Sequence, residues 1–488
     1  MSLRMLWRAR AAGIIAGAAL AACAPDPTGT TEQLTTVSAP VRPSVVTQAW
    51  PITDLGTLPG GLFSFANDLN ASTVVVGYAE YAPFRRHAMR WDAGSGMMDL
   101  GALVATEESS AEAINDAGEI VGTSGNGSGF SRAFVWTPAA GMVELPSGTQ
   151  TGAQAFDITN QHLIVGCGAL PGLTVSQVLQ WSPNATGGWS VTGVGSPIGS
   201  AGTACAHGAE GTNLVGWATI SGQLTGFRRT GGLYTTLGVE TMAHRLVAGR
   251  FVGSESIPFV ANASPQEWPS LSAPSFPLGY LYYEGGDALD LNAANHIVGT
   301  VAGLPDPVLP SVTRAFYWDC AGGMSDLGSL GGLPNEFAAA TAINASDIVA
   351  GASNNHAVIW GVTPGPNDVV PLPYNPGCTI PPIVSYIPRK FINDGILSRP
   401  GFDATQIDPN TVTIGDGFGH VTPAMPPGPP NFVFRDLNGD GVTDMQVRFS
   451  KAQMIADGTL TLQSFQLVVN WTDPTGLPNS GKYPIRVK

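Results

Sequence analysis

The sequence predicts an all-β protein: a seven-bladed β-propeller with four short strands per blade, followed by a small β-sandwich. Three observations predict this fold class. The 488 residues include 62 Gly and 39 Pro, which suits many short strands joined by turns. Charged residues make up only 12% of the chain, fewer than long helices need. In addition, one motif recurs seven times at the spacing of propeller blades.

Residues 1–22 have the features of an export signal. Arg4, Arg8 and Arg10 precede a short apolar run, and small residues then lead to Cys23. The run is too short to span a bilayer as a mature helix. Leu20-Ala-Ala-Cys23 resembles the lipobox of bacterial lipoproteins, which implies that the peptide is removed before Cys23 and that Cys23 carries the lipid anchor. The alternative is a plain secretory signal with a chance cysteine.

The residues after the cysteine favour a flexible tether at an outer surface. Residues 23–47 are rich in Thr, Pro and Ser and lack apolar periodicity. Ala24 stands where an Asp would signal inner-membrane retention in enteric bacteria, so we expect the outer membrane or the cell surface. The net charge of −14 argues against nucleic acid as a partner, because phosphate binding needs clustered Lys and Arg.

The internal repeat is the strongest signal in the chain. One copy reads Ala111-Glu-Ala-Ile-Asn-Asp-Ala-Gly-Glu-Ile-Val-Gly122, and each copy closes on a Gly eleven positions after its start. The other copies span 66–77, 155–166, 205–216, 242–253, 288–299 and 340–351. Each copy predicts a hairpin, with Asn at the turn and a Gly that marks a bulge or a close backbone approach.

Two further strands complete each unit. The third ends in Trp, as in His87-Ala-Met-Arg-Trp91, and the fourth ends in Leu, as in Met98-Asp-Leu100. The fourth and fifth copies depart from this pattern around Phe227 and Phe259. Four strands in about 45 residues is the length of a propeller blade, and such units bury their faces only against neighbours.

The strand that closes the ring has two candidates. Ile52-Thr-Asp-Leu55 precedes the first unit and could complete the last blade, whereas Val369-Val-Pro-Leu372 offers a fourth strand in place. An imperfect eighth blade is a further alternative. We expect seven blades between residues 48 and 375.

These motifs resemble the HAF family of extracellular repeat proteins. The family combines His-Ala-Phe-x-Trp, Asp-Leu-Gly-Thr-Leu-Gly-Gly and Ile-Asn-x-x-Gly-x-Ile-Val-Gly. Asp54-Leu-Gly-Thr-Leu-Pro-Gly-Gly61 and Asp326-Leu-Gly-Ser-Leu-Gly-Gly332 match well over residues 50–372. The resemblance implies an extracellular location and a repeat architecture. It brings no catalytic residue.

A separate C-terminal β-sandwich is expected at 383–488, after a Pro-rich linker. Its loop Asp436-Leu-Asn-Gly-Asp-Gly-Val-Thr-Asp444 has oxygen ligands at calcium spacing and Gly at the sharp turn. We expect a structural Ca²⁺ there. The alternative is a solvated turn. The ligands would be Asp436, Asn438, Asp440, the carbonyl of Val442, and Asp444.

Four cysteines remain after Cys23, and an even number in an exported chain permits disulfides. Cys167 with Cys205 and Cys320 with Cys378 is the favoured pairing, since the first two lie in adjacent units; two other pairings are possible.

The repeated polar positions favour structure over chemistry. His87 and His356 occupy one repeat position together with Arg132 and Arg314. Acids recur at another, where we expect them to bond to turns, although they could instead form an acidic face; they are Asp54, Asp99, Glu144 and Asp326. No nucleophile elbow, zinc-protease motif or phosphate loop occurs in the sequence.

The sequence therefore favours a non-enzymatic, lipid-anchored surface protein whose propeller binds a protein or a carbohydrate. The second hypothesis is a propeller enzyme that acts on polysaccharide or peptidoglycan through paired carboxylates. The third is a periplasmic assembly factor at the outer membrane. Fold class alone does not separate the three.

Overall fold

The computed structural model describes residues 50–487 apart from internal gaps. The gaps are 126, 128, 149–151, 173–175, 198–199, 257–262, 279–284, 304–311, 320–322, 332–335, 362–368, 372–382, 385–390, 399–401, 417–419, 427–430, 438–440, 462–465, 473–477 and 485. Cys23 and the predicted signal and tether lie outside these residues. No helix within the described part is long and apolar enough to cross a membrane.

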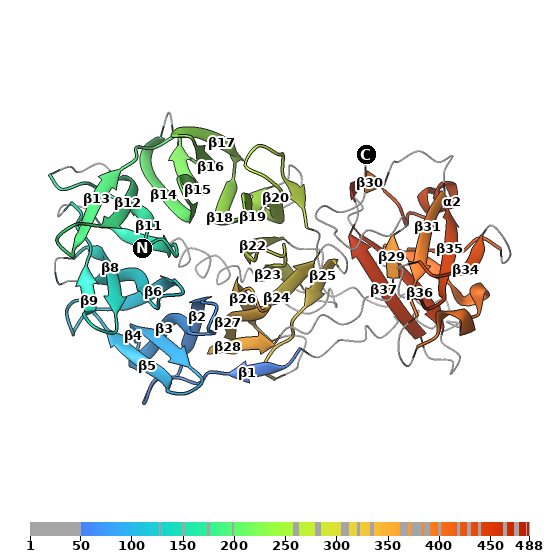
Figure 1. The fold of residues 1–488 in the computed structure, drawn as a ribbon, viewed down its shortest axis with the longest axis horizontal. Helices are drawn as coiled ribbons and strands as arrows, with labels where there is room; N and C mark the ends of the chain where they lie inside the picture. The colour runs from blue at the N-terminus through green and yellow to red at the C-terminus, as the bar shows by residue number, and fades with distance from the viewer. Residues whose placement is uncertain are drawn as a thin grey trace, which may run out of the picture. The chain divides into compact units, whose positions relative to one another are not determined.

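The described residues between 50 and 361 form seven four-stranded antiparallel sheets, numbered here 1 to 7 along the chain (Figure 1). Each of sheets 1 to 6 consists of four consecutive strands, and sheet 7 consists of three strands joined by β1. Sheets 1 to 3 contain β2 (Ser64–Leu69), β3 (Val75–Ala82), β4 (Arg85–Asp92), β5 (Gly96–Gly101), β6 (Ser109–Ile114), β7 (Ile120–Gly125), β8 (Ser131–Thr137), β9 (Gly141–Glu144), β10 (Gln154–Ile158), β11 (Ile164–Gly168), β12 (Gln177–Pro183) and β13 (Trp189–Gly193).

Sheets 4 to 7 continue the series. Their strands are β14 (Ser200–Glu210), β15 (Asn213–Ile220), β16 (Gln223–Thr230), β17 (Leu233–Val239), β18 (Thr241–Val247), β19 (Arg250–Ser256), β20 (Ala263–Trp268), β21 (Phe276–Pro277), β22 (Gly286–Leu291), β23 (Ile297–Gly303), β24 (Val312–Asp319), β25 (Gly323–Asp326), β26 (Ala338–Ile343), β27 (Ile348–Ser353), β28 (His356–Gly361) and β1 (Ile52–Asp54). Four-stranded antiparallel sheets repeated around a centre are the arrangement of a β-propeller.

The N-terminal strand closes the ring. β1 pairs antiparallel with β28, with Ile52 opposite Trp360 and Asp54 opposite Val358. Sheet 7 also bonds directly to sheet 1, because Thr341 Oγ1 donates to the carbonyl of Ala66. The structure therefore selects Ile52–Leu55 as the closing strand and leaves Val369–Leu372 out of sheet 7.

The third-strand tryptophans pack between sheets, as the sequence predicted. Trp181 of sheet 3 is fully buried against Val121, Ala133 and Val135 of sheet 2. Trp318 and Trp360 are fully buried as well. Because each sheet buries such a residue against its neighbour, no single sheet has a complete core.

The repeated Gly marks a close backbone approach beside a bulge. A Cβ at Gly77 would lie 1.9 Å from the carbonyl oxygen of Phe65, and the same overlap recurs at the equivalent Gly of all seven sheets. Each of these glycines faces a one-residue bulge in the innermost strand. Only Gly fits there, which explains the repeat.

Asparagines at the first turn of each hairpin link consecutive sheets. Asn344 Oδ1 accepts the amides of Ser346 and Ile348, and its Nδ2 donates to the carbonyl of Asn70 in sheet 1. Asn70 repeats the arrangement toward the carbonyl of Asn115, and Asn292 does so toward that of Asn344. This asparagine belt (Asn292, Asn344, Asn70 and Asn115) runs from sheet 6 through sheets 7, 1 and 2 to sheet 3, where Asn115 Nδ2 meets the carbonyl of Thr159.

The fourth and fifth copies lack the belt, and the structure corrects their frame. Gly216 and Gly253 pair with Ala206 and Ala243, one residue later than the predicted starts at 205 and 242. The reason is a tighter two-residue turn, formed at Ala248 and Gly249 with positive φ at both. The third strand of sheet 5 is Ala263–Trp268, and Phe259, around which the sequence placed it, lies outside the described residues.

The C-terminal residues form two four-stranded sheets and one two-stranded sheet among the described residues. Ile414, Phe449 and Trp471, from different strands, belong to one hydrophobic cluster. The elements are β29 (Val369–Pro371), β30 (Ile383–Val384), β31 (Phe391–Ile396), η1 (Ala404–Gln406), η2 (Pro409–Thr411), β32 (Thr413–Gly415), β33 (Val421–Pro423), β34 (Phe432–Arg435), β35 (Asp444–Ser450), α2 (Lys451–Ala456), β36 (Gln466–Thr472), β37 (Pro478–Pro484) and β38 (Arg486–Val487).

One predicted boundary was placed too late. β29, inside the range 48–375 predicted for the propeller, pairs with β31 of the C-terminal sheet. The C-terminal unit therefore begins at or before Val369, ahead of the predicted start at 383. Pro371 ends this short strand, and Pro at such positions suits the edge of a sheet, where no further amide is needed.

Asn344→Ala is expected to lower the free energy of unfolding by about 2 kcal/mol, because a buried belt residue loses its turn bonds and its bond to sheet 1. Denaturant unfolding measures this change. Asn184→Ala is the matched control, since Asn184 caps its own turn through Thr186 and Gly188 and makes no bond between sheets in the described structure. Equal losses in the two variants would contradict a role of the belt in holding sheets together.

Candidate binding site at the centre of the ring

The innermost strand of every sheet presents two adjacent positions toward the middle of the ring. The first is the bulged residue, and the second follows it. The bulged residues are Asn67, Glu112, Phe156, His207, His244, Leu289 and Thr341. The residues after them are Asp68, Ala113, Asp157, Gly208, Arg245, Asp290 and Ala342. A bulge changes the direction in which side chains point. We call these two recurring positions the inner wall of the ring.

Three aspartates of the second position each hold the next sheet. Asp68 Oδ2 accepts the amide of Ile114 at 2.9 Å, which joins sheets 1 and 2. Asp157 Oδ2 accepts the amide of Ala209 at 3.0 Å. Asp290 Oδ2 accepts the amide of Ile343 at 2.8 Å. These carboxylates are buried, and their oxygens serve the backbone of sheets 2, 4 and 7.

Arg245 of sheet 5 connects two of the three aspartates. Its Nη1 lies 2.6 Å from Asp157 Oδ1, and its Nε lies 3.3 Å from Asp290 Oδ1. The guanidinium therefore spans sheets 3, 5 and 6. Asp157, more than any other group, raises the pKa of Arg245, so the arginine stays charged. Gly208 leaves room for it, because a Cβ there would lie 3.1 Å from the Cα of Arg245.

This cluster contains three carboxyl groups and one guanidinium group, so it would carry a net negative charge if all of them were ionised. Burial raises the pKa of Asp68 to about 7, although the charge of Arg245 acts in the opposite direction. Burial likewise raises the pKa of Asp290 to about 6. Removing charged carboxylates from water is unfavourable unless partners compensate, so Asp68 takes up a proton near neutral pH.

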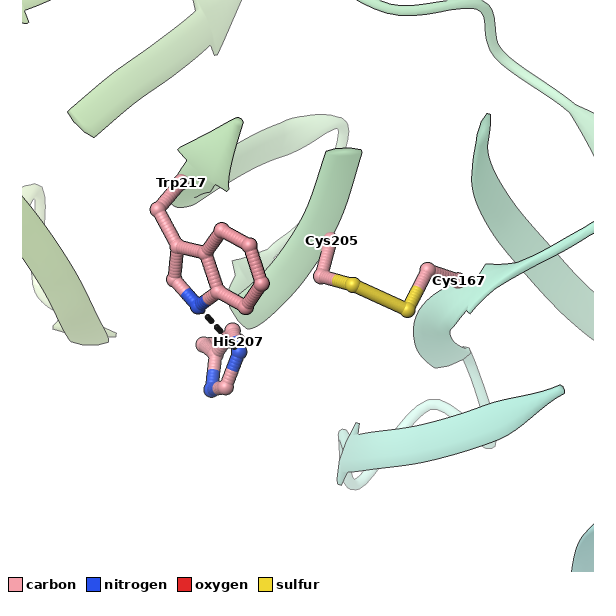
Figure 2. Close-up of a disulfide and its surroundings, with 4 residues drawn as sticks. All are labelled: Cys167, Cys205, His207 and Trp217. Atoms are coloured by element: carbon pink, nitrogen blue, oxygen red, sulfur yellow. Dashed lines mark hydrogen bonds between the residues drawn. A yellow bond between two sulfur atoms is a disulfide. The ribbon is translucent and has the colours of Figure 1, made fainter. Parts of the chain in front are cut away.

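Aromatic and imidazole rings of sheets 3 to 5 form the adjacent part of the wall. Phe156 stacks on His207 with ring centroids 4.1 Å apart, and His244 meets His207 edge-on at 6.0 Å. Trp217 Nε1 donates to His207 Nε2 at 2.8 Å (Figure 2). An imidazole nitrogen that accepts a bond carries no proton, so His207 is neutral with its proton on Nδ1.

A histidine–aspartate pair continues this wall into sheet 6. His244 Nε2 lies 2.8 Å from Asp287 Oδ2. The other oxygen of Asp287, Oδ1, is buried and has no hydrogen-bond partner in the described structure. We call Phe156, His207, Trp217, His244 and Asp287 the ring-wall cluster. Its charge and hydrogen-bonding capacity are concentrated at His244 and Asp287.

A disulfide fixes the base of the ring-wall cluster. Cys167 of sheet 3 and Cys205 of sheet 4 are bonded, with Cα atoms 4.7 Å apart (Figure 2). Both are buried and pack with Trp217 in one hydrophobic cluster. The structure thus contains the favoured first pair, whereas Cys320 and Cys378 lie outside the described residues.

The repeated acids bond to turns, as expected, and they also pair within their own sheets. Asp99 Oδ1 accepts the amide of Gly101 at 2.7 Å and lies 2.9 Å from His87 Nδ1. The same third-to-fourth-strand pairing joins His356 to Asp54, Arg314 to Asp326 and Arg132 to Glu144. These residues attach the outermost strand, so they do not form a common acidic face.

The predicted calcium loop is described only in part. Asn438 and Asp440 lie outside the described residues. Asp436 Oδ2 accepts the amide of Gly441 at 2.9 Å, and Val442 is exposed. Asp444 is buried, and its oxygens accept the amides of Ser398 and Leu437, both at 2.8 Å. Among the described residues, no group of three or more His, Cys, Asp or Glu side chains is placed to hold a metal ion.

Sequence reasoning missed the inner-wall residues. The Asp two places after the first Ala recurs in three copies, at Asp68, Asp157 and Asp290, and Arg245 replaces it in the fifth. Alignment of the copies on their Gly shows this Asp nine positions before the Gly in three copies, but in the fifth copy it places His244 there instead of Arg245. The frame shift of the fourth and fifth copies hid it, because His207 and His244 then fall at different repeat positions.

The comparisons with known proteins show only remote likeness. No family model and no curated protein matches the chain. A gluconolactonase from Xanthomonas campestris aligns with 64% of this chain and 90% of its own, at 10% identity and a TM-score of 0.34. TolB from Acinetobacter baumannii aligns with 57% of this chain and 77% of its own, at 12% identity and a TM-score of 0.31. Neither likeness carries a function to this chain.

Asp68→Asn is expected to change how stability depends on pH. The pKa of Asp68 is about 7 in the folded protein, against about 3.9 in an unfolded chain. The folded state therefore binds more protons between these values, and this group makes stability fall as pH rises through that window. The variant should be more stable relative to the unmodified protein at pH 8 than at pH 5, by denaturant unfolding.

Asp92→Asn is the control for this experiment. Hydrogen bonding to Arg90 lowers the pKa of Asp92 to about 2, so its stabilising effect is lost only below the unfolded value, as pH falls through that range. Its effect should be the same at pH 5 and pH 8. A constant difference for Asp68→Asn over that range would show that Asp68 is ionised throughout.

Proposed function

We propose that this chain is an exported, lipid-anchored bacterial surface protein whose seven-bladed propeller is a non-enzymatic scaffold for a protein or glycan ligand. Cys23 carries the lipid, residues 23–47 are the tether, and the location is the outer membrane or cell surface. The C-terminal unit is a β-sandwich with a structural Ca²⁺. The resemblance of the repeats to the HAF family supports the extracellular assignment.

One observation carries the choice of a scaffold over an enzyme. The three carboxylates at the position after the bulge each accept a backbone amide of a neighbouring sheet, and two of them also bind Arg245. A glycoside hydrolase of the usual kind needs one carboxyl group free to donate a proton and another free to attack or to activate water. Asp68, Asp157 and Asp290 are engaged in holding the ring together.

The ring-wall cluster is the part of the propeller best suited to recognise a ligand. Three of its members, His207, Trp217 and His244, lie in sheets 4 and 5, which depart from the repeat. Phe156 and His207 are partly exposed and stacked, and His244 with Asp287 adds a polar edge. Apolar ring faces beside hydrogen-bonding groups suit a sugar ring or a peptide side chain.

A single specific observation favours the enzyme as second candidate. The His244–Asp287 pair is an imidazole oriented by a carboxylate, an arrangement that general bases also use. In the scaffold, the same pair links sheet 5 to sheet 6. Replacing His244 tests both candidate functions. Only the enzyme would convert a substrate, so a measurement of turnover distinguishes the enzyme from the scaffold.

Binding without turnover is the expected result. The full chain with Cys23→Ser, incubated with purified peptidoglycan or surface polysaccharide, should sediment with one of them and release no reducing ends or soluble fragments. Phe156→Ala should weaken sedimentation roughly tenfold, since a stacked aromatic contributes on the order of 1–2 kcal/mol. Phe65→Ala, which removes an aromatic stacked on Tyr78 in sheet 1, is the control. Fragment release that His244→Ala abolishes would establish the enzyme instead.

Calcium is expected to raise the melting temperature of the C-terminal unit in the full chain, because an ion that binds only the folded state stabilises it. Asp440→Ala should abolish this increase. Asp408→Ala is the control, since Asp408 is an exposed aspartate that caps η2 and lies outside the loop. A shift of a few degrees that survives Asp440→Ala, or no shift in the unmodified protein, would contradict a Ca²⁺ site in the loop.

A further inference from the structure

Two apolar side chains project from one end of sheet 1. Leu62, in the loop between β1 and β2, is 78% exposed, and Phe84, in the turn between β3 and β4, is 94% exposed. Large apolar side chains at this level of exposure are unfavourable in water unless something covers them. We call Leu62, Phe84 and the adjacent Arg85 the apolar tip.

A buried carboxylate holds both parts of the apolar tip in place. Glu80 Oε2 accepts the amide of Leu62 at 2.7 Å, and Oε1 accepts the amide of Phe84 at 2.8 Å. Glu80 is only 5% exposed. Phe84 has a φ of +62°, which side chains other than Gly adopt only when their surroundings impose it. The two side chains are thus fixed outward before any contact, so binding requires little further ordering.

Sheet 2 repeats the arrangement with smaller exposure. Val104 lies in the loop before β6 and is 37% exposed, and Phe130 lies in the turn before β8 and is 45% exposed. Both connections join the same pairs of strands as those that carry Leu62 and Phe84. They are therefore at the same end of their sheet, and four apolar side chains face one side of two consecutive sheets.

The charge beside the apolar tip identifies the class of partner. The chain has a net charge of −14 and only 22 basic residues, yet Arg85 and Arg86 stand together next to Phe84. Arg85 is exposed, whereas Arg86 lies over the ring of Tyr78 and 3.9 Å from Glu108 Oε2, so Arg85 supplies the positive charge at the tip itself. Apolar side chains flanked by arginines suit the boundary between acyl chains and anionic headgroups of a bilayer.

The N-terminal tether keeps the apolar tip within reach of that bilayer. Twenty-six residues separate Cys23 from Trp50, the first described residue, which is buried. A chain of that length reaches at most about 90 Å when fully extended. β1 follows at once, and the loop after β1 carries Leu62. The chain between the anchor and the apolar tip is therefore short.

We propose that the apolar tip inserts into the surface of the lipid bilayer that holds the anchor. This inference rests on the proposed lipid at Cys23, which supplies the nearby bilayer. A single lipidated residue with a second, weaker contact fixes orientation as well as location, so one face of the propeller turns toward the membrane and the other end of the ring faces outward.

Vesicle binding of the full chain with Cys23→Ser tests the proposal without the lipid. The protein should sediment with vesicles of phosphatidylethanolamine and phosphatidylglycerol. The double variant Leu62→Ser, Phe84→Ser should lower the partition coefficient by at least tenfold, because two large apolar side chains lose their insertion. Leu233→Ser is the matched control: Leu233 is 76% exposed and is the first residue of β17 in sheet 4, directly after the turn between its third and fourth strands.

Three results would overturn the insertion. They are vesicle binding that the double variant leaves unchanged, an equal loss with Leu233→Ser, and no vesicle binding together with a dimer that the double variant dissociates. The last would assign the apolar tip to a second copy of the chain. The anchor is judged separately in cells, where Cys23→Ser should leave the membrane fraction after a salt wash; retention there would sink the anchor and not the insertion.

Discussion

Ring closure is the constraint on which the rest of the structure depends. Among the described residues of the ring, no sheet has a complete core, because the third-strand tryptophans are buried against a neighbouring sheet. The ring must therefore close for any sheet to be stable, and β1 closes it on β28 with three residue pairs. So short a seam is sufficient because Thr341 and Asn344 bond across the same junction, to Ala66 and Asn70. Ring closure therefore depends on several weak contacts together and not on any single one.

Neighbouring sheets are joined in two ways: by residues that recur in the repeat, and by residues specific to the copies that depart from it. The asparagine belt serves sheets 6, 7, 1, 2 and 3, and it stops where the fourth and fifth copies lose their Asn. Other ties occur there: the disulfide between sheets 3 and 4, the contacts of Arg245 with Asp157 and Asp290, and Glu210, whose oxygens accept the amides of Ala248 and Gly249. Repeated residues therefore explain the ring, and residues of the two altered copies join with residues of sheets 3 and 6 to form the local ties and the ring-wall cluster.

Much of the fold could be predicted from the sequence, because Gly, Asn and Trp at fixed offsets each answer a local physical need. The Gly admits a close carbonyl, the Asn caps a turn, and the Trp fills the space between sheets. The ring-wall cluster could not be predicted in this way. His207 and His244 lie on bulges whose register depends on turns one residue shorter than those of the other copies, and Arg245 pairs with an aspartate 88 positions away. A charge pair between residues so far apart in the sequence produces no periodic sequence pattern.

The position of the closing strand in the sequence also determines when the ring can close during synthesis. Ile52–Asp54 is made about three hundred residues before its partner around Trp360. At roughly 5–20 residues per second, synthesis of that interval takes on the order of 15 to 60 s. Throughout this time sheet 7 does not exist, and the inner strand of sheet 1 has no neighbour on one side. The nascent propeller is thus an open arc whose unpaired strand edges are templates for pairing with another chain until residues around Trp360 have been made.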